Sequence, residues 1–430
     1  MISLSQKIKH ILIIFNKWEY AALCLLIIMM LVMHFVTIST PKSLVFDEAY
    51  YVPAANNILH GVSLGRIEHP PLGQAIIATG IWIFGDNPLG WRFFSVIFGA
   101  ISLILFYLIC RKLDLSKYIT FIATTFLALD NLSFTQAGTA MLDVFCLAFM
   151  FASVFCYLKK RPVWTGIFIG LATCTKLTGI LVLLFILIYW LIINRKSIKM
   201  EIITIVTSGV SFCGSLIALD TIILHKLQNP ISRITYMISY AKNLTFTSYI
   251  PDISGAIPSR PWEWLFHESI TYNTLTHIWG GVYNSIVNPC IWILIIPIVL
   301  FLIYLTLKHE KPAIFALCWF AATYIIWIPI SLFTNRLTYE YYFYPAVGSI
   351  CIGIALLLSR IKGTHINIQV FKNFLRISVP LYMGITILFL IFIYSFGSIW
   401  FRMSWAAILF LIILYYLDRF QSLKTTPNNN

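Results

Sequence analysis

Long apolar stretches, separated by shorter polar intervals, run along almost the whole chain. Most of them approach the length that a helix needs to cross a bilayer, about 20 residues. The pattern predicts an all-α polytopic membrane protein with about twelve transmembrane helices (11–13). The predicted spans lie near residues 20–39, 92–110, 118–130, 140–158, 163–175, 177–193, 202–221, 290–307, 312–333, 341–358, 377–396 and 401–417. Residues 75–85 are too short and interrupted for a span and are predicted to form an interfacial helix.

Two polar intervals are long, at residues 45–74 and 222–289. We expect both on the extracytoplasmic side, the second as the longer outer loop. The chain shows no internal repeat and no segment with the composition of a soluble domain. Residues 1–430 are therefore predicted to form a single membrane-embedded domain, in which C-terminal helices over 377–417 precede a polar tail over 418–430.

The composition supports a membrane protein. Hydrophobic residues make up 60% of the 430 residues and charged residues 11%, against about 25% charged in soluble domains. The net charge is +14, but Lys and Arg gather in alternate loops, which indicates cytoplasmic loops rather than a nucleic-acid partner. The nine cysteines form no C-x-x-C pair, so neither a disulfide framework nor a zinc site is expected.

The loop charges also predict an orientation. With the N-terminus in the cytoplasm, every predicted inner loop carries Lys or Arg, and most acidic residues fall on the outer side. A site on the outer side has no access to cytosolic nucleotide sugars or ATP. Group transfer there would need a donor embedded in the membrane.

The 45–74 interval opens with two adjacent carboxylates, Asp47 and Glu48. Adjacent carboxylates repel, so one of them tends to have a raised pKa unless a cation is near. In a partly dry pocket such a group can act as a general base toward a hydroxyl. The alternative is a solvated helix cap, with Asp47 as the N-cap of a helix that begins at Glu48.

The same interval closes with Glu68, His69 and the sequence Pro-Pro-Leu-Gly. The prolines rule out a helix through His69, so both side chains are presented in a rigid turn where they could position a substrate. The alternative is a plain loop that ends the interval. A metal-ligand role for His69 is not favoured, because no second His lies at ligand spacing and no H-E-x-x-H motif occurs.

Three charged residues lie inside or beside predicted spans: Asp130, Asp143 and Lys176. The two acids flank a segment that we interpret as a polar turn. A charge within a membrane helix costs ~3 kcal/mol on insertion scales, so such residues usually face a cavity or a partner. We expect the acids to position a substrate, and Lys176 either to neutralise one of them or to bind a phosphate.

Two later features have both a functional and a structural interpretation. Trp262 belongs to a Trp/Tyr-rich region, which is either an aromatic belt at the membrane interface or a cover over a sugar-binding cleft. Arg336 lies at a predicted outer membrane boundary. It could clamp a phosphate through two N–H donors, or it could anchor the helix by snorkelling.

Eight segments follow one another over about residues 40–350: FDEAYYVPAA, EHPPLG, GDNPLGWRFFSVIFGA, ALDNLSFTQAGTAMLD, TCTKLTGI, SRPWEW, YNSIVNPCIW and NRLTYEYYFYPAV. Taken in this order, they resemble motifs of the protein O-mannosyltransferases. This family belongs to the GT-C glycosyltransferases, which use polyprenyl-phosphate sugars. Each motif alone is weak, and the resemblance rests on their order.

The resemblance implies a GT-C fold with Asp47 as the catalytic base and Glu48 as its neighbour in positioning. Lys176, Arg336 and Arg92 are then the candidate ligands of the donor phosphate. One displacement with one base would invert the anomeric carbon. No metal and no other cofactor is implied.

The chain departs from the family at two positions, where Gln74 and Gly138 replace the usual Lys and Arg. Both changes remove a positive charge from a phosphate-binding site and leave the details of donor and acceptor binding open. The 222–289 interval is too short for the β-trefoil insert of eukaryotic members, so the chain resembles the compact prokaryotic type.

The expected activity is transfer of a sugar, most simply mannose, from a polyprenyl (dolichyl) phosphate carrier to Ser/Thr hydroxyls of proteins. The expected partners are the lipid-linked donor, a protein or peptide acceptor and membrane lipids, without nucleic acid. One alternative keeps the donor but uses a lipid or cell-surface glycan acceptor. Another is a transporter with Asp143 and Lys176 on its path, although the sequence lacks the paired halves that transporters tend to show.

Overall fold

The computed structural model describes residues 19–62, 65–193, 198–248, 258–265 and 289–363, most of which are helical. The helices are α2 (Glu19–Thr37), α3 (Glu48–Leu59), α4 (Leu72–Phe84), α5 (Pro88–Lys112), α6 (Lys117–Leu129), α7 (Asn131–Gly138), α8 (Leu142–Leu158), α9 (Pro162–Thr175), α10 (Leu181–Ile193), α11 (Ile198–Leu224), α12 (Pro230–Asn243), α14 (Pro289–Trp292), α15 (Ile295–Leu307), α16 (Lys311–Phe320), α17 (Trp327–Thr334) and α18 (Tyr344–Gly363). The short turns are η1 (Leu177–Ile180), η2 (Glu263–Leu265), η3 (Ala321–Ile325) and η4 (Glu340–Phe343).

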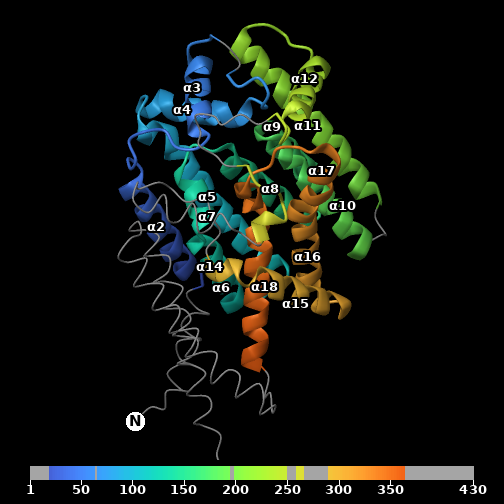
Figure 1. The fold of residues 1–430 in the computed structure, drawn as a ribbon. Coiled ribbons are helices and arrows are strands. Elements are labelled where there is room, and N and C mark those ends of the chain that lie inside the picture. The colour runs from blue at the N-terminus through green and yellow to red at the C-terminus, as the bar shows by residue number, and fades with distance from the viewer. Residues whose placement is uncertain (1–18, 63–64, 194–197, 249–257, 266–288, 364–430) are drawn as a thin grey trace, which may run out of the picture.

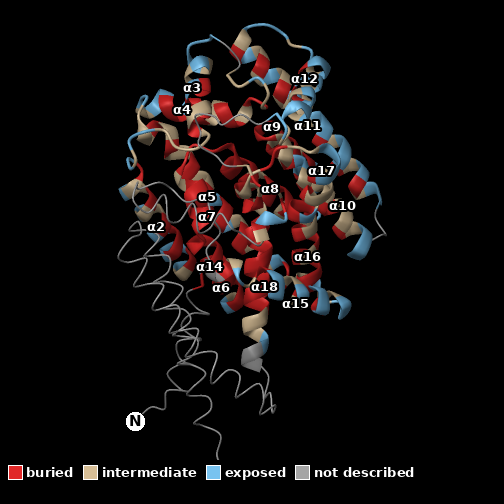
Figure 2. Cartoon of the chain, viewed as in Figure 1, coloured by how far each residue is buried: buried red, intermediate tan, exposed pale blue. Residues whose placement is uncertain are grey.

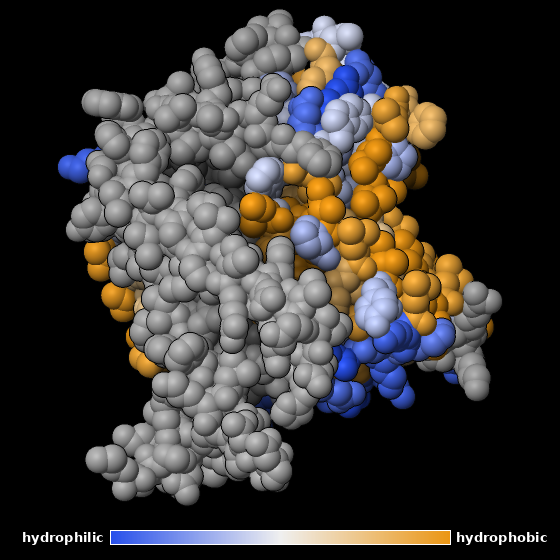
Figure 3. All heavy atoms as spheres, turned by 60° about the horizontal axis from the view of Figure 1, so that its bottom comes forward, coloured by the Kyte–Doolittle hydropathy of each residue, from blue (hydrophilic) through white to orange (hydrophobic). Residues whose placement is uncertain are grey.

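Several helices have the length and apolarity of membrane spans. Among the described residues, five qualify, and up to six if the bent α7–α8 pair counts as one span. Figure 3 shows hydrophobic side chains gathered in a broad band on the surface, with hydrophilic ones towards its two ends. The chain is therefore an integral, multi-pass membrane protein. The predicted spans near 377–396 and 401–417 lie outside the described residues, so the count of twelve stays a prediction.

The segment between Asp130 and Asp143 is not the polar turn that the sequence analysis predicted. Residues Asn131–Gly138 form α7, and the chain then bends by 110° into α8. Asp130 caps α7, because its carboxylate accepts hydrogen bonds from the Ser133 amide (2.8 Å) and hydroxyl (2.9 Å). Most side chains of α7 are buried, so its polar residues lie in the interior of the protein rather than in a solvated loop.

Close helix packing forms the centre of the molecule, where Figure 2 shows the buried residues. Helix α9 packs between α8 and α11. A Cβ added to Gly166 would lie 1.8 Å from Thr207 Oγ1, and one added to Gly170 would lie 2.5 Å from Ser211 Oγ. Small residues allow membrane helices to approach this closely. The packing fixes the end of α9, and Lys176 follows directly.

Helices α3, α4 and α12 gather at one end of the molecule (Figure 1). Helix α4 confirms the helix predicted over 75–85 and begins earlier, at Leu72, just after the two prolines. Helix α12 lies within the 222–289 interval, for which the sequence analysis predicted no element. The Leu337 amide donates to the Leu244 carbonyl (2.8 Å), and a single β-bridge joins Thr245 to Arg336. These contacts place the end of α12 beside the 335–339 segment.

Candidate active site

A cavity of about 190 Å³ lies at this end of the molecule. It is lined by Asp47, Tyr50, Tyr51, Arg66, Glu68, His69, Lys176, Leu177, Thr178, Tyr240, Ala241, Leu244, Arg336, Leu337, Tyr339, Tyr341 and Tyr342. Five of the predicted site residues therefore meet here, although they are up to 289 positions apart in the chain (336 − 47). The wall is rich in tyrosine, which offers both ring faces and hydroxyl groups to a ligand.

Asp47 directs its carboxylate towards tyrosines rather than capping a helix. It occupies the N-cap position of α3, but its side chain makes no cap hydrogen bond. The Tyr341 hydroxyl donates to Asp47 Oδ2 at 2.9 Å, and the Tyr51 hydroxyl donates to the same atom at 3.4 Å. Burial, and next the charge of Asp47, raises the pKa of Tyr51 well above 10, so Tyr51 remains a donor. The alternative of a merely solvated cap is not supported by this geometry.

Lys176 and Asp143 form a buried ion pair. Lys176 Nζ lies 2.8 Å from each carboxylate oxygen of Asp143. The ammonium also lies 5.2 Å and 5.0 Å from the ring centroids of Tyr341 and Tyr342, within the range of cation–π attraction. Asp143 stands in the first turn of α8, where the helix dipole favours a negative charge. Lys176 thus neutralises Asp143, which is one of the two roles predicted for it. It also lines the cavity.

Two further cations line the cavity. Arg336 donates to the Ala241 carbonyl through Nη1 at 2.7 Å. Arg66, which the sequence analysis did not single out, pairs with Glu68 and lies over the Tyr50 ring at 4.5 Å. The cavity therefore brings three cations, Lys176, Arg336 and Arg66, together with two carboxylates, Asp47 and Glu68, so it can offer positive charge to an anionic ligand beside a carboxylate.

His69 is held neutral in this environment. Burial, and then the charges of Lys176 and Arg66, lowers the pKa of His69 to about 3. Its ring meets the Tyr51 ring edge-on at a centroid distance of 5.6 Å. A neutral imidazole can position a ligand through hydrogen bonds, but it carries no charge to offer a phosphate.

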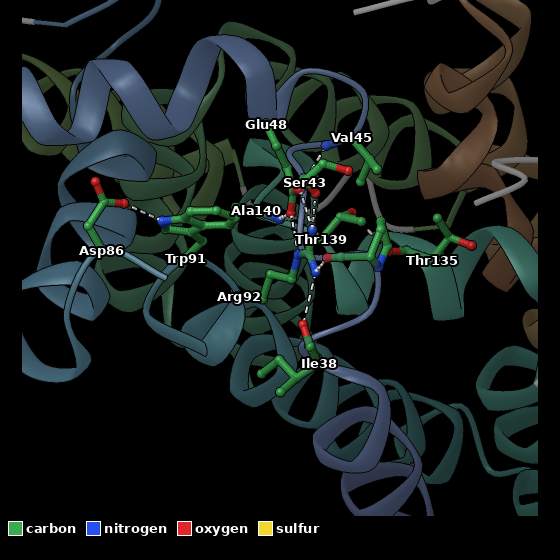
Figure 4. A network of polar contacts seen from close by, with 11 residues as sticks. Ile38, Ser43, Val45, Glu48, Asp86, Trp91, Arg92, Thr135, Thr139 and Ala140 are labelled. Atoms are coloured by element: carbon green, nitrogen blue, oxygen red, sulfur yellow. Dashed lines mark hydrogen bonds and ion pairs between the residues drawn. The ribbon is translucent and has the colours of Figure 1, made fainter. Parts of the chain in front are cut away.

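The structure does not support the ligand contacts predicted for Arg92 and Glu48, because both residues lie outside the cavity and have no exposed surface. Arg92 Nε and Nη2 donate to the two Glu48 oxygens at 2.8 and 2.7 Å (Figure 4). Arg92 also donates to the backbone carbonyls of Ile38, Pro41 and Ser43 at 2.9–3.1 Å. A guanidinium enclosed in this way cannot contact a donor phosphate, so we no longer assign Arg92 that role.

Glu48 is the acceptor at the centre of this network. Besides Arg92, it accepts hydrogen bonds from the backbone amides of Ala140 (2.8 Å) and Val45 (3.0 Å). The network joins the loop after α2, the start of α3 and the turn before α8. Glu48 therefore fixes the backbone on which Asp47 stands, rather than contacting a ligand in the cavity.

Asp130 and Trp262 also lie outside the cavity lining. Asp130 is fully buried and caps α7, as described above. Trp262 is 38% exposed, and its ring lies 5.8 Å from the guanidinium of Arg260. Neither geometry supports the predicted substrate contact, and for Trp262 it favours the interfacial interpretation.

The structure shows what surrounds Gln74 and Gly138, the two positions at which the chain departs from the family pattern. Gln74 is fully buried, and its side-chain amide pairs with both the amide (2.8 Å) and the carbonyl (3.1 Å) of Arg66. It therefore holds the loop that carries Arg66 into the cavity. At Gly138, an added Cβ would lie 3.2 Å from the His34 ring, so a larger residue there would press on α2.

We predict that Gln74→Ala loosens this loop. Two hydrogen bonds are lost, the Arg66 amide loses its partner and the Arg66 carbonyl keeps only the His69 amide, which should cost about 1–3 kcal/mol. Thermal unfolding in detergent micelles measures the loss, and hydrogen exchange at the Arg66 amide localises it. Asn57→Ala, on the exposed side of α3, is the matched control and should change neither quantity. Unchanged exchange at Arg66 in Gln74→Ala would contradict the assignment.

Comparison with solved structures shows which fold the chain has. The structure of ArnT from Cupriavidus metallidurans in the apo state matches with a TM-score of 0.53 at 16% identity, covering 78% of this chain and 59% of that one. The described residues have the helical fold of the GT-C glycosyltransferases.

Sequence comparison then gives the family resemblance. The family described as dolichyl-phosphate-mannose-protein mannosyltransferase matches residues 68–217. A polyprenol-phosphate-mannose--protein mannosyltransferase of Mycolicibacterium smegmatis is 37% identical over 123 residues, which cover 27% of this chain and 24% of that protein. The protein of the same name from Corynebacterium glutamicum is 23% identical over 408 residues, covering 74% of this chain and 78% of its own length. The resemblance to protein O-mannosyltransferases is therefore confirmed.

Proposed function

We propose that this chain is an inverting glycosyltransferase that moves mannose from a polyprenyl-phosphate carrier to Ser/Thr hydroxyls of proteins. The observation that carries the proposal is the meeting of one carboxylate, Asp47, with the cations Lys176 and Arg336 in a single cavity. A base for the acceptor and cations for the leaving phosphate are the groups that this reaction needs. The names of the sequence relatives supply the donor sugar and the acceptor class.

The reaction is a single displacement. Asp47 takes the proton of the acceptor hydroxyl as its oxygen attacks the anomeric carbon of the sugar. The bond from that carbon to the phosphate oxygen breaks, and the electron pair leaves with the lipid phosphate. Lys176 and Arg336 stabilise the charge of the departing phosphate. Because attack and departure occur on opposite faces, the product has the inverted configuration.

The structure also supports the proposed orientation. The basic residues at the end of the molecule opposite the cavity include Arg111 and Lys117, both paired with Glu19, and Arg360, paired with Glu310. By the positive-inside rule we propose that this end faces the cytoplasm, with the N-terminus cytoplasmic and the cavity extracytoplasmic. A donor embedded in the outer half of the bilayer can reach the cavity, whereas a cytosolic nucleotide sugar cannot.

Purified protein, polyprenyl-phosphate mannose and a Ser/Thr-rich peptide test the proposal directly. Mannosylated peptide with the inverted anomeric configuration is the expected product. Transfer to membrane lipid or glycan, with the peptide unmodified, would support the alternative acceptor. A carrier that remains intact in proteoliposomes would contradict the proposal and point to transport.

The phosphate role of Lys176 predicts a large effect of Lys176→Gln. Loss of a preorganised positive charge at the leaving group should lower kcat/KM by about 100-fold. Transfer rates over a range of donor concentrations measure it. The double variant Lys176→Gln, Asp143→Asn removes the unpaired carboxylate and should stay equally impaired.

Lys308→Gln is the control. Lys308 also lies over a tyrosine ring, with its ammonium 4.4 Å from the centroid of Tyr304, but at the end of the molecule opposite the cavity. Recovery of activity in the double variant would show that Lys176 serves only Asp143.

A further inference from the structure

A buried ion pair outside the cavity joins three segments. Asp220, near the end of α11, is 1% exposed, and Arg233, near the start of α12, is 6% exposed. Arg233 Nε donates to Asp220 Oδ2 at 3.2 Å, and Nη2 donates to the backbone carbonyl of His69 at 3.0 Å. One guanidinium therefore connects α11, α12 and the His69 turn.

The His69 turn depends on outside partners. The two residues after His69 are prolines, which have no N–H to donate, so the turn can form few backbone hydrogen bonds of its own. The His69 amide donates to the Arg66 carbonyl at 3.0 Å, while the His69 carbonyl accepts from Arg233. Gly73, four residues further on, packs so closely that an added Cβ would lie 3.1 Å from Thr175 Cγ2. The turn thus lies between Arg233 on one side and the residue before Lys176 on the other.

Helix α12 carries the opposite wall of the cavity. Tyr240 and Ala241, in its last turns, line the cavity, and the Ala241 carbonyl accepts the hydrogen bond of Arg336. Since α12 is a single helix of 14 residues, Arg233 holds its start, while contacts of Ala241, Leu244 and Thr245 with residues 336 and 337 hold its end. Displacing Arg233 would therefore loosen together two segments that carry cavity walls, the His69 turn and α12.

The pair is poorly satisfied for a purely stabilising element. Asp220 Oδ1 and Arg233 Nη1 are buried and have no hydrogen-bond partner among the described residues. Burying two charges is costly, and a pair with unmet hydrogen bonds contributes little net stability. We therefore interpret the Arg233–Asp220 contact as one that positions α12 and the His69 turn rather than one that stabilises the fold.

We propose that Arg233, held by Asp220, is a positioning residue that sets the width of the donor cavity by fixing the His69 turn against α12. This inference rests on the proposed function for its kinetic consequence, but its structural consequence is independent of it. Asp47 is held separately, by Tyr341 and through the Glu48–Arg92 network. Loss of Arg233 should therefore weaken binding of the donor more than it slows the chemical step.

The experiment compares Arg233→Gln, Arg233→Lys and Asp220→Asn in the full-length protein. For Arg233→Gln we expect KM for polyprenyl-phosphate mannose to rise by about 10-fold while kcat changes by less than about 3-fold, because uniform binding is what is lost. Arg233→Lys keeps the charge towards Asp220 and should give an intermediate KM. Arg360→Gln is the control, because it breaks an ion pair at the opposite end and should leave both constants unchanged.

Hydrogen exchange supplies a readout that needs no activity. In Arg233→Gln the amides of residues 72–76 and 231–243 should exchange faster, whereas those of α5 should not. If Arg233→Gln does not fold, Arg233→Lys and Asp220→Asn carry the same test. An unchanged KM, a fall in kcat alone, or unchanged exchange in both segments would overturn the inference. If the parent protein transfers no sugar, the proposed function fails, and the exchange result still decides whether Arg233 couples the two segments.

Discussion

Replacing Asp47 by asparagine is expected to reduce sugar transfer by at least about 100-fold, because a positioned general base contributes about 10²–10⁴-fold. Asparagine has the same shape, and its amide oxygen can still accept the hydrogen bond from Tyr341, which lies 2.9 Å from the carboxylate. The variant should therefore fold and be expressed as well as the parent. Initial rates of peptide mannosylation, measured at saturating donor, give the effect.

Asp86→Asn is the matched control for this prediction. Asp86 is also an acid at the cavity end, and it accepts hydrogen bonds from Asn56 and Trp91 outside the cavity. Its substitution should change the rate by less than about two-fold, as is usual for exposed positions away from a site. Transfer by Asp47→Asn above a tenth of the parent rate would count against Asp47 as the base.

Replacing Arg92 by leucine is expected to destabilise the protein by about 3–5 kcal/mol, the usual cost of leaving one partner of a buried ion pair alone. Glu48 would remain completely buried without its cation, and three backbone carbonyls would lose a donor. Thermal unfolding in detergent micelles, or the yield of folded protein after extraction, measures the loss. Donor affinity of any surviving folded protein should be close to that of the parent.

Arg111→Gln provides the comparison for Arg92→Leu. Arg111 is 33% exposed, and its partner Glu19 keeps a second cation, Lys117. Partly exposed pairs contribute about 0–1 kcal/mol, so this change should cost little. If Arg92→Leu is no more costly than Arg111→Gln, or if it selectively weakens donor binding, the structural role assigned to Arg92 is wrong.

The sequence predicted much of the architecture because membrane helices are defined by local composition. The apolar stretches gave the spans that the structure describes between α2 and α18, and the helix at α4. Helix α12 was missed although its start carries a readable signal, Asn229 followed by Pro230, which is a capping residue before a proline at the first helical position. The polar interval around it obscured this signal.

The site was predicted only in part, because sequence order shows which residues are charged but not which way they point. Asp47 and Glu48 looked like one acidic pair. Consecutive residues at the start of a helix project in directions about 100° apart, so one carboxylate faces the cavity and the other faces the interior. The partners of each, Tyr341 and Arg92, depend on contacts between distant segments, which no local pattern contains.

The different roles of the neighbouring residues Asp47 and Glu48 limit how the proposed site can be redesigned. A glutamate in place of Asp47 would extend its carboxylate by one methylene towards Tyr341. An aspartate in place of Glu48 would be too short to reach the Arg92 guanidinium, which is fully buried and cannot shift towards it. A mutagenesis library that treats the two positions as interchangeable negative charges would therefore recover few active clones. Diversity is better introduced at a cavity tyrosine such as Tyr240, because the Tyr341 and Tyr51 hydroxyls donate to Asp47 and have to be kept.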